Sequence, residues 1–444
     1  MLILPRKLSR IKEHQIAADS WKIVRTGHSC AAVSSYDSPP EKIFFRLSQS
    51  TSRLVKAGAE ASSVEGKNLE SEYLPAGLFT SHFGGYRQCE RNFIAKVKID
   101  ISALAFDKIN RKTKPPGSLG VLEIIAVRLA ILQETLEPRL SKKRICVYAG
   151  SHGVASEAVS AYPTEVTAQM VLNFVSGGAA INVLSRHGAI DLHIIDAGVD
   201  TDWPESVLRM PDFYFRSVRR GTSNFYREPA MSEAECQQAL EIGREQVRDA
   251  LEDGIDLLGI GEMGIGNTTA ASALLVALCG LKPTQAVGRG TGIDDGALQR
   301  KVEVVAGAYE RYSPAFSEPA GLYWLQAIGG FEIAAMAGTL LEAARARLPV
   351  VIDGFIATAA AAAAFSIDQD CREVCFFSHR SSEQAHGNAL EALKVEPLLD
   401  LKMRLGEGTG AALAMPILEA ATKLFCEMAT FESAGISGAI GEGK

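Results

Sequence analysis

The stretch DLLGIGEMGIGNTTAASALLVALC (residues 256–279) contains an apolar run, a glycine-rich loop and an Ala/Leu-rich helical period in immediate succession. The run at 256–260 is apolar after its first residue and does not alternate, which is typical of a strand covered on both faces of a parallel sheet. The loop leads directly into the helix expected over 267–279. A strand that passes through a short loop into a helix is half of a βαβ unit, so this stretch predicts an α/β fold.

The same alternation recurs from about residue 97 onward. Further strands are expected at 144–149, 192–196, 350–352 and 374–377, and further helices at 121–135, 165–186, 232–252, 296–312, 328–346 and 381–393. Because parallel neighbours need crossover helices, the pattern predicts a doubly wound, mainly parallel sheet flanked by helices. Ligands of such sheets bind beyond the carboxyl ends of the strands, which is where the glycine-rich loops fall.

Composition narrows the class of protein. The 444 residues are 47% hydrophobic and carry a net charge of −6, so no basic surface indicates a nucleic-acid partner. The eight cysteines are scattered, and Cys371 and Cys375 have no second pair at zinc-ligand spacing, so neither a metal nor a cofactor is expected. Reduced thiols suit a cytoplasmic protein. No run approaches the roughly 20 strongly apolar residues of a membrane span.

Residues 1–95 differ from the remainder. Residues 1–60 contain ten Lys/Arg and five Asp/Glu, with many serines and no sustained period. A transit peptide is one interpretation, but such peptides are poor in acidic residues. A disordered or non-native extension is the preferred interpretation, followed by one domain over 96–440.

The loop of residues 264–268 is a candidate anion site. Gly264, Gly266, Asn267 and Thr268 would place amides and small hydroxyls at a helix N-terminus, where the helix dipole favours a phosphate. Simple capping by Asn267 or Thr268 is the alternative. Neither a Walker lysine pattern nor the dinucleotide glycine motif is present.

A second loop of the same type contains Gly290, Thr291 and Gly292 and precedes the helix that holds Lys301. A lysine between two glycine loops can complete a phosphate site as a point charge. Most lysines on helices are merely solvated, which is the alternative. Ser381 lies in another polar loop that follows a strand.

The stretch RLGEGTGA (residues 404–411) places Glu407 between two glycines immediately before an apolar helix. Glycines leave the backbone accessible to a ligand, so a glutamate framed in this way is a candidate catalytic group. Glu262, within the loop quoted first, is its counterpart.

Seven segments together resemble one enzyme family. They are KPPGSLG (114–120), HGV (152–154), PTEVTAQM (163–170), GEMGIGNTT (261–269), IGGFEIAAMAG (328–338), VVIDGF (350–355) and RLGEGTGAALAMP (404–416). Their order over about residues 97–440 resembles that of nicotinate-nucleotide:dimethylbenzimidazole phosphoribosyltransferases, which make the α-riboside phosphate of the cobamide lower ligand.

The resemblance implies an α/β core over about 140–400, a small helical part from about 96–135 and 410–440, and a homodimer. It implies that Glu407 is the general base and Glu262 the second active-site glutamate. It also implies that Lys301, Ser381 and the loops at 264–268 and 290–292 line the pocket for nicotinate mononucleotide.

Several positions depart from the family pattern. Tyr162, Met170 and Met263 stand where serine, glutamine and leucine are frequent, so the pocket for the acceptor base has fewer polar contacts. A benzimidazole, a purine or a phenol all remain possible acceptors. Ser151 stands where aspartate is frequent.

Two rival functions remain. A diphosphate-dependent phosphoribosyltransferase would carry adjacent acidic residues after an apolar strand, but the adjacent pair Asp294-Asp295 follows a glycine loop. A non-catalytic phosphate or nucleotide sensor of the same fold would keep the glycine loops without using Glu407.

Overall fold

The computed structural model describes residues 21–26, 29–34, 43–46, 101–290, 292–315 and 320–437. The chain divides into two units, residues 1–81 and 82–444. The first contains an antiparallel sheet of β1 (Trp21–Thr26), β2 (Ser29–Ser34) and β3 (Ile43–Arg46). The assignment of residues 1–95 as an extension stays a prediction.

The second unit is built on a six-stranded parallel sheet in the order β6-β5-β4-β7-β8-β9. The strands are β4 (Lys143–Gly150), β5 (Asp191–Gly198), β6 (Phe213–Phe215), β7 (Leu257–Met263), β8 (Val350–Ile352) and β9 (Cys375–Phe377). The chain builds outward from β4 to β6, then returns to the other side of β4 and builds outward from β7 to β9. The strand order therefore reverses between β4 and β7, the position at which ligands bind in open α/β sheets. The predicted fold class is confirmed.

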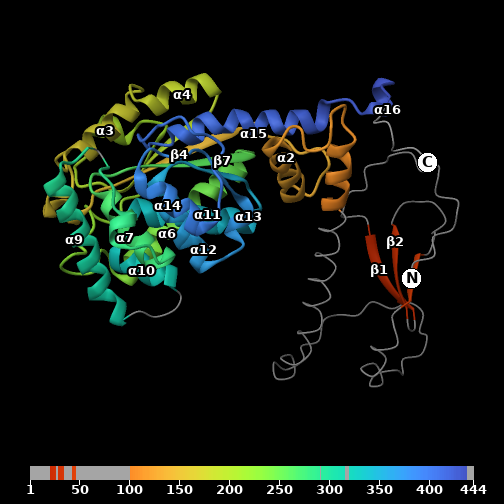
Figure 1. Cartoon of the computed structure of the whole chain (residues 1–444). Coiled ribbons are helices and arrows are strands. Elements are labelled where there is room, and N and C mark those ends of the chain that lie inside the picture. Colours follow the sequence, from red (N-terminus) through yellow and green to blue (C-terminus); the bar gives the residue numbers. More distant parts are fainter. Residues whose placement is uncertain are drawn as a thin grey trace, which may run out of the picture. The chain divides into compact units, whose positions relative to one another are not determined.

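Helices flank the sheet (Figure 1). The longer ones are α2 (Val121–Leu132), α3 (Val166–Val175), α4 (Ala180–Gly188), α6 (Glu233–Glu252), α7 (Asn267–Cys279), α9 (Asp295–Tyr312), α10 (Ala320–Ile328), α11 (Phe331–Ala346), α12 (Phe355–Ile367), α14 (Gln384–Leu393) and α15 (Thr409–Glu427). Single turns are α5 (Glu205–Leu208), α8 (Pro283–Ala286), α13 (Cys371–Val374) and α16 (Phe431–Ala434). Helix α15 packs on β7 and β8 and also against α2, so segments from both ends of this unit lie side by side (Figure 1).

Several elements differ from expectation, among them α10 and the single turns, which were not predicted. The prediction of a single helix over 165–186 is wrong. The helix is interrupted at residues 176–179, where Gly177 has a φ of 77°. The edge strand β6 was not predicted, and it is only partly buried, unlike the equally short β8 and β9. The pattern also missed α12, whose alanines are buried on all sides and therefore show no amphipathic period.

One helical stretch, Val166–Gly188, has the length and mean hydropathy (1.2) of a membrane span. It consists of the two helices α3 and α4, and the last turn of α4 contains Arg186 and His187. Its length and composition are therefore weak evidence for a span.

The packing of α6 on α11 depends on two glycines. A Cβ on Gly243 would lie 1.8 Å from the Ala335 carbonyl oxygen, and a Cβ on Gly338 would lie 1.9 Å from the Leu240 carbonyl oxygen. Both obstacles are backbone atoms, so no side-chain rotation can relieve them. The two helices can approach this closely only with glycine at these positions.

Gly243→Ala is therefore expected to destabilise the fold by about 3 kcal/mol, the upper part of the range for overpacking. Gly296→Ala is the matched control, since a Cβ there meets only Asp294 Oδ1 at 3.5 Å in the first turn of α9. The urea midpoints of both variants measure the difference. Equal midpoints would contradict this account of the α6–α11 contact.

Candidate active site

A cavity of about 650 Å³ lies at the carboxyl ends of β7, β8 and β9. Its wall is formed by the loops that follow β7, β8 and β9, by α3, and by the turn that precedes α15. The lining residues are Tyr162, Val166, Met170, Glu262, Met263, Gly264, Ile265, Asn267, Thr268, Gly290, Gly354, Phe355, Ile356, His379, Ser381, Glu383, Arg404, Leu405, Gly406 and Glu407.

The structure brings together most of the residues that the sequence singled out. Ten of them line the cavity: Glu407, Glu262, Gly264, Asn267, Thr268, Gly290, Ser381, Tyr162, Met170 and Met263. Gly266, Gly292 and Lys301 are not part of the lining, although Lys301 contacts the lining residue Thr268. Thr291 lies outside the described residues.

Glu407 occupies a left-handed turn. Gly406, Glu407 and Gly408 have φ values of 87°, 64° and 84°. A glutamate in this conformation costs roughly 1–3 kcal/mol of local strain, so the surrounding structure must hold it there. β7 contributes to this, because a Cβ on Gly261 would lie 2.3 Å from the backbone nitrogen of Gly408. Strand and turn therefore meet backbone to backbone, and Glu407 is fixed relative to the sheet.

The Glu407 carboxylate is poised to exchange a proton near neutral pH. Glu407 is 6% exposed, and its Oε2 has no hydrogen-bond partner among the described residues. Burial, with a smaller contribution from the nearby Asp353 carboxylate, raises the pKa of Glu407 to about 7. A base works best when its pKa lies near the working pH, so this group is suited to general base catalysis.

Glu262 lies beside the same turn. Its Oε1 would meet a Cβ on Gly406 at 2.5 Å, and its Oε2 accepts a hydrogen bond from Asn267 Nδ2. Burial and the charges of Asp353 and Glu332 raise the pKa of Glu262 to about 8. Two carboxyl groups thus line the same cavity, and burial and the charge of Asp353 raise the pKa of both.

Another part of the wall, at Thr268 and Gly290, is a candidate anion site that Lys301 supports from behind. The N-terminus of α7 presents Thr268, whose Oγ1 accepts a hydrogen bond from Lys301 Nζ at 2.8 Å across from α9. Lys301 Nζ also reaches the Gly288 carbonyl at 3.4 Å, and burial lowers the pKa of the ammonium group to about 8. Gly290 lies over this pair, because a Cβ there would meet Thr268 Oγ1 at 3.2 Å and Lys301 Nζ at 3.5 Å. A lysine, a hydroxyl and a helix N-terminus converge on one place, as phosphate recognition requires.

The remaining wall is mainly apolar. Tyr162 and Leu405 are half exposed at the rim, and Val166, Met170, Met263, Phe355 and Ile356 line the rest of this wall. Apolar and aromatic walls of this kind bind flat rings, with few groups that read polar substituents.

Several groups near the site were missed by the sequence reasoning. Glu383 lines the cavity and accepts a hydrogen bond from the Gly290 amide at 2.8 Å. Asp353 follows β8 and binds the start of α15. Each is a single acid after a short apolar strand or within a polar loop, a signal too weak to identify in isolation. Ser151 does not line the cavity, and its Oγ accepts a hydrogen bond from the Asp200 amide at 3.0 Å, so its role is to hold a loop.

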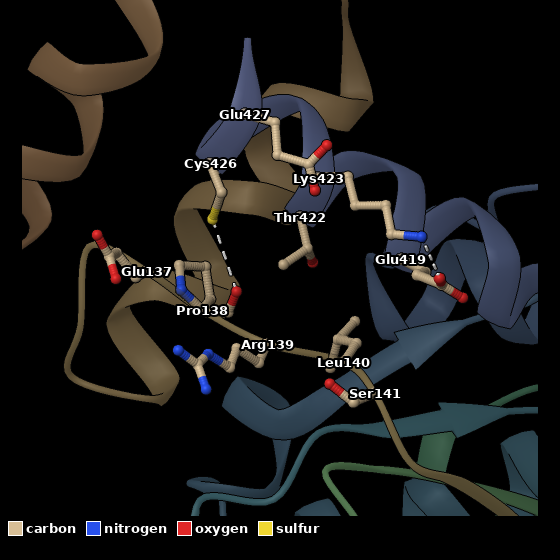
Figure 2. Close-up of a pocket in the computed structure, with 10 residues that line it drawn as sticks. All are labelled: Glu137, Pro138, Arg139, Leu140, Ser141, Glu419, Thr422, Lys423, Cys426 and Glu427. Atoms are coloured by element: carbon tan, nitrogen blue, oxygen red, sulfur yellow. Dashed lines mark hydrogen bonds and ion pairs between the residues drawn. The ribbon is translucent and has the colours of Figure 1, made fainter.

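A second cavity, of about 310 Å³, lies between α15 and the segment 137–141 (Figure 2). Cys426 Sγ donates to the Pro138 carbonyl at 3.6 Å there, and Lys423 pairs with Glu419 at 2.7 Å (Figure 2). None of the residues that the sequence singled out lines this cavity. Among the described residues, no group of three or more His, Cys, Asp or Glu side chains is arranged to hold a metal ion.

Fold and site together are typical of an α/β enzyme whose cavity contains two buried carboxyl groups beside a candidate anion site. A family model described as phosphoribosyltransferase matches residues 94–436. Nicotinate-nucleotide–dimethylbenzimidazole phosphoribosyltransferase of Pelodictyon phaeoclathratiforme is 48% identical over 330 residues, which are 74% of this chain and 92% of that protein. The enzyme of the same name from Chlorobaculum tepidum is 47% identical over 345 residues, which are 78% of this chain and 96% of that protein.

A solved structure of the same family also matches this chain. The crystal structure of CobT from Thermus thermophilus has a TM-score of 0.73 and 46% sequence identity, and the match covers 77% of this chain and 100% of that chain. The chain belongs to the nicotinate-nucleotide:dimethylbenzimidazole phosphoribosyltransferase family. The resemblance drawn from the sequence motifs is confirmed.

Proposed function

We propose that this enzyme transfers phosphoribose from nicotinate mononucleotide to an aromatic lower-ligand base in the assembly of the cobalamin or cobamide nucleotide loop. The products are an α-riboside 5′-phosphate and nicotinate. The observation that carries the proposal is the buried Glu407 carboxylate, with its raised pKa, in a cavity that also contains the anion site at α7.

The chemistry explains why one base is sufficient. Nicotinate in the substrate is already a pyridinium at the C1′–N bond, so it leaves without receiving a proton. The attacking heterocycle must lose its N–H proton, because its ring would otherwise remain positively charged in the product. Glu407 accepts this proton, and Glu262 positions the acceptor or stabilises positive charge that develops on ribose. Attack from the face opposite nicotinate converts a β-linkage into an α-linkage.

Phosphate binding supports the reaction from a distance. Lys301, Thr268, Ser381 and the loops at 264–268 and 290–292 hold the 5′-phosphate away from the reacting carbon. Interactions remote from the bond that breaks can supply orientation in the transition state, so they contribute to rate as well as affinity.

The acceptor is an aromatic base, either 5,6-dimethylbenzimidazole or a related benzimidazole, purine or phenol. Met170 and Met263 give the pocket polarisable, adaptable walls, and Tyr162 supplies a ring at the rim. These side chains favour the recognition of ring shape over a second polar substituent.

The working form is a cytoplasmic homodimer. The helical segment 101–110 and α2 expose Leu104, Phe106, Val121 and Ile124, and exposed apolar side chains favour burial against a second copy. Six cysteines, Cys146, Cys236, Cys279, Cys371, Cys375 and Cys426, are free thiols, which suits a reducing compartment.

The direct test mixes the enzyme with nicotinate mononucleotide and a panel of bases, then measures nicotinate release and identifies the riboside product. We expect release that depends on the base, with a benzimidazole among the accepted substrates. A sensor would instead produce heat in calorimetry and no nicotinate. A diphosphate-dependent enzyme would turn over only with phosphoribosyl diphosphate and magnesium.

A further inference from the structure

The side chain of Asp353 binds the beginning of α15. It follows β8 directly and is 2% exposed. Its Oδ2 accepts a hydrogen bond from the Gly408 amide at 2.9 Å, and its Oδ1 accepts from the Gly410 amide at 2.7 Å and from the Ala411 amide at 3.2 Å. A carboxylate that receives three amide hydrogen bonds at a helix N-terminus is held in one orientation.

These contacts fix the peptide that follows Glu407. The amide of Gly408 belongs to the peptide bond that joins it to Glu407, so Asp353 holds one side of the left-handed turn. Gly261 of β7 also lies against the same backbone nitrogen. The turn is therefore clamped between β7 and the loop that follows β8.

We propose that Asp353 is the positioning residue of the general base, which holds the left-handed turn at Glu407 and sets the electrostatic environment of its carboxylate. The inference rests on the proposed function of Glu407. Asp353 does not line the cavity, so it acts through Glu407 and not through the substrate.

The charge of Asp353 has a second effect. It raises the pKa of Glu407, although burial is the larger cause, and it contributes in the same direction at Glu262. Two other groups act on Glu262. The charge of Glu332 also raises its pKa, and the hydrogen bond from Asn267 lowers it. His379 lies close to Asp353 and opposes the rise that burial causes in the pKa of Asp353.

Asp353→Asn tests both effects, since it keeps the shape but removes the charge and replaces an acceptor by a donor. We expect kcat to fall by about 10- to 100-fold, with KM for nicotinate mononucleotide within about twofold, because the base is misplaced while the phosphate site is intact. The acid limb of the kcat profile should move to lower pH. Asp353→Glu retains the charge, so it should lower kcat without moving this limb.

Asp196→Asn is the matched control. Asp196 is fully buried in β5 and accepts hydrogen bonds from the Gly198 and Val199 amides at 2.8 and 2.7 Å, but it binds a different loop. A merely structural role for Asp353 would make both Asn variants alike, with no change in the pH profile, and this would overturn the proposal. So would wild-type kcat in either Asp353 variant.

A double-mutant cycle separates this inference from the proposed function. If Asp353 acts through Glu407, then Asp353→Asn should have less than about a threefold effect on kcat in the Glu407→Gln background. An effect as large as in the wild-type background would contradict the inference. A wild-type enzyme that releases no nicotinate from nicotinate mononucleotide with any base would refute the proposed function instead.

Discussion

Glu407→Gln is expected to lower kcat for nicotinate release by about 10²–10⁴-fold, the range over which general base catalysis contributes. The amide has nearly the shape of the carboxylate but cannot accept the proton of the incoming base. KM for nicotinate mononucleotide should change little, because the phosphate site lies on another part of the wall. Steady-state kinetics with a fixed saturating base measures the two constants.

The pH dependence gives an independent check. With a pKa of about 7, Glu407 is protonated in more acidic solution, so wild-type kcat should fall about tenfold per pH unit below 7. The residual activity of Glu407→Gln should lack this limb. The same acid limb in both proteins would assign the base to another group.

The stability of Glu407→Gln must be measured as a control, so that a loss of kcat is not mistaken for unfolding. The folded pKa of Glu407 lies above the usual 4.5, so ionisation of this carboxylate destabilises the fold as pH rises from about 4.5 to 7. Glutamine does not ionise, and the variant should be at least as stable as wild type at pH 8. Glu419→Gln, on the helix α15 that follows Glu407 and outside the active-site cavity, should keep wild-type kcat. Wild-type activity in Glu407→Gln would end the assignment of Glu407 as base.

Local patterns predicted the sheet well, because buried parallel strands are apolar runs with characteristic lengths. The stretch 256–279 contains a strand, a loop and a helix that the structure places at Leu257–Met263 and Asn267–Cys279. The alanine-rich helix α12 could not be predicted in the same way, since a helix buried on all sides has no polar face. The division of 165–186 into α3 and α4 falls at the glycine pair Gly177-Gly178, a local turn signal that the helical period obscured.

The candidate site was predictable where glycines mark it. The frames around Glu262 and Glu407 are visible as motifs, and both side chains line the same cavity. Their elevated pKa values were not predictable in magnitude, because they arise from burial and from Asp353, and at Glu262 also from Glu332, which lie on other elements. Sequence spacing could not show which of Arg300 and Lys301 faces the site. Arg300 forms an ion pair with Glu157, whereas Lys301 turns inward to Thr268.

Lys301→Met is expected to lower kcat/KM for nicotinate mononucleotide by about 150-fold, which corresponds to about 3 kcal/mol for the loss of one partner of a buried charged contact. Methionine fills the space of the buried lysine stem without the charge. In wild type, burial lowers the pKa of Lys301 to about 8, so the ammonium group loses its proton as pH rises through this value. KM for the nucleotide should therefore rise above pH 8 in wild type and remain constant in the variant. Arg311→Met, at the last turn of the same helix, should match wild type.

Kinetics with nicotinate riboside, which lacks the 5′-phosphate, test whether the loss of kcat/KM in Lys301→Met is specific to phosphate binding. The wild-type enzyme should use the riboside with a lower kcat as well as a higher KM, because remote binding energy is realised partly in the transition state. If Lys301 binds the phosphate, then Lys301→Met should affect the riboside reaction by less than about threefold. An equal loss of kcat/KM with both substrates would show that Lys301 only stabilises the α7–α9 contact, and an unchanged kcat for the riboside would show that the phosphate supplies affinity alone.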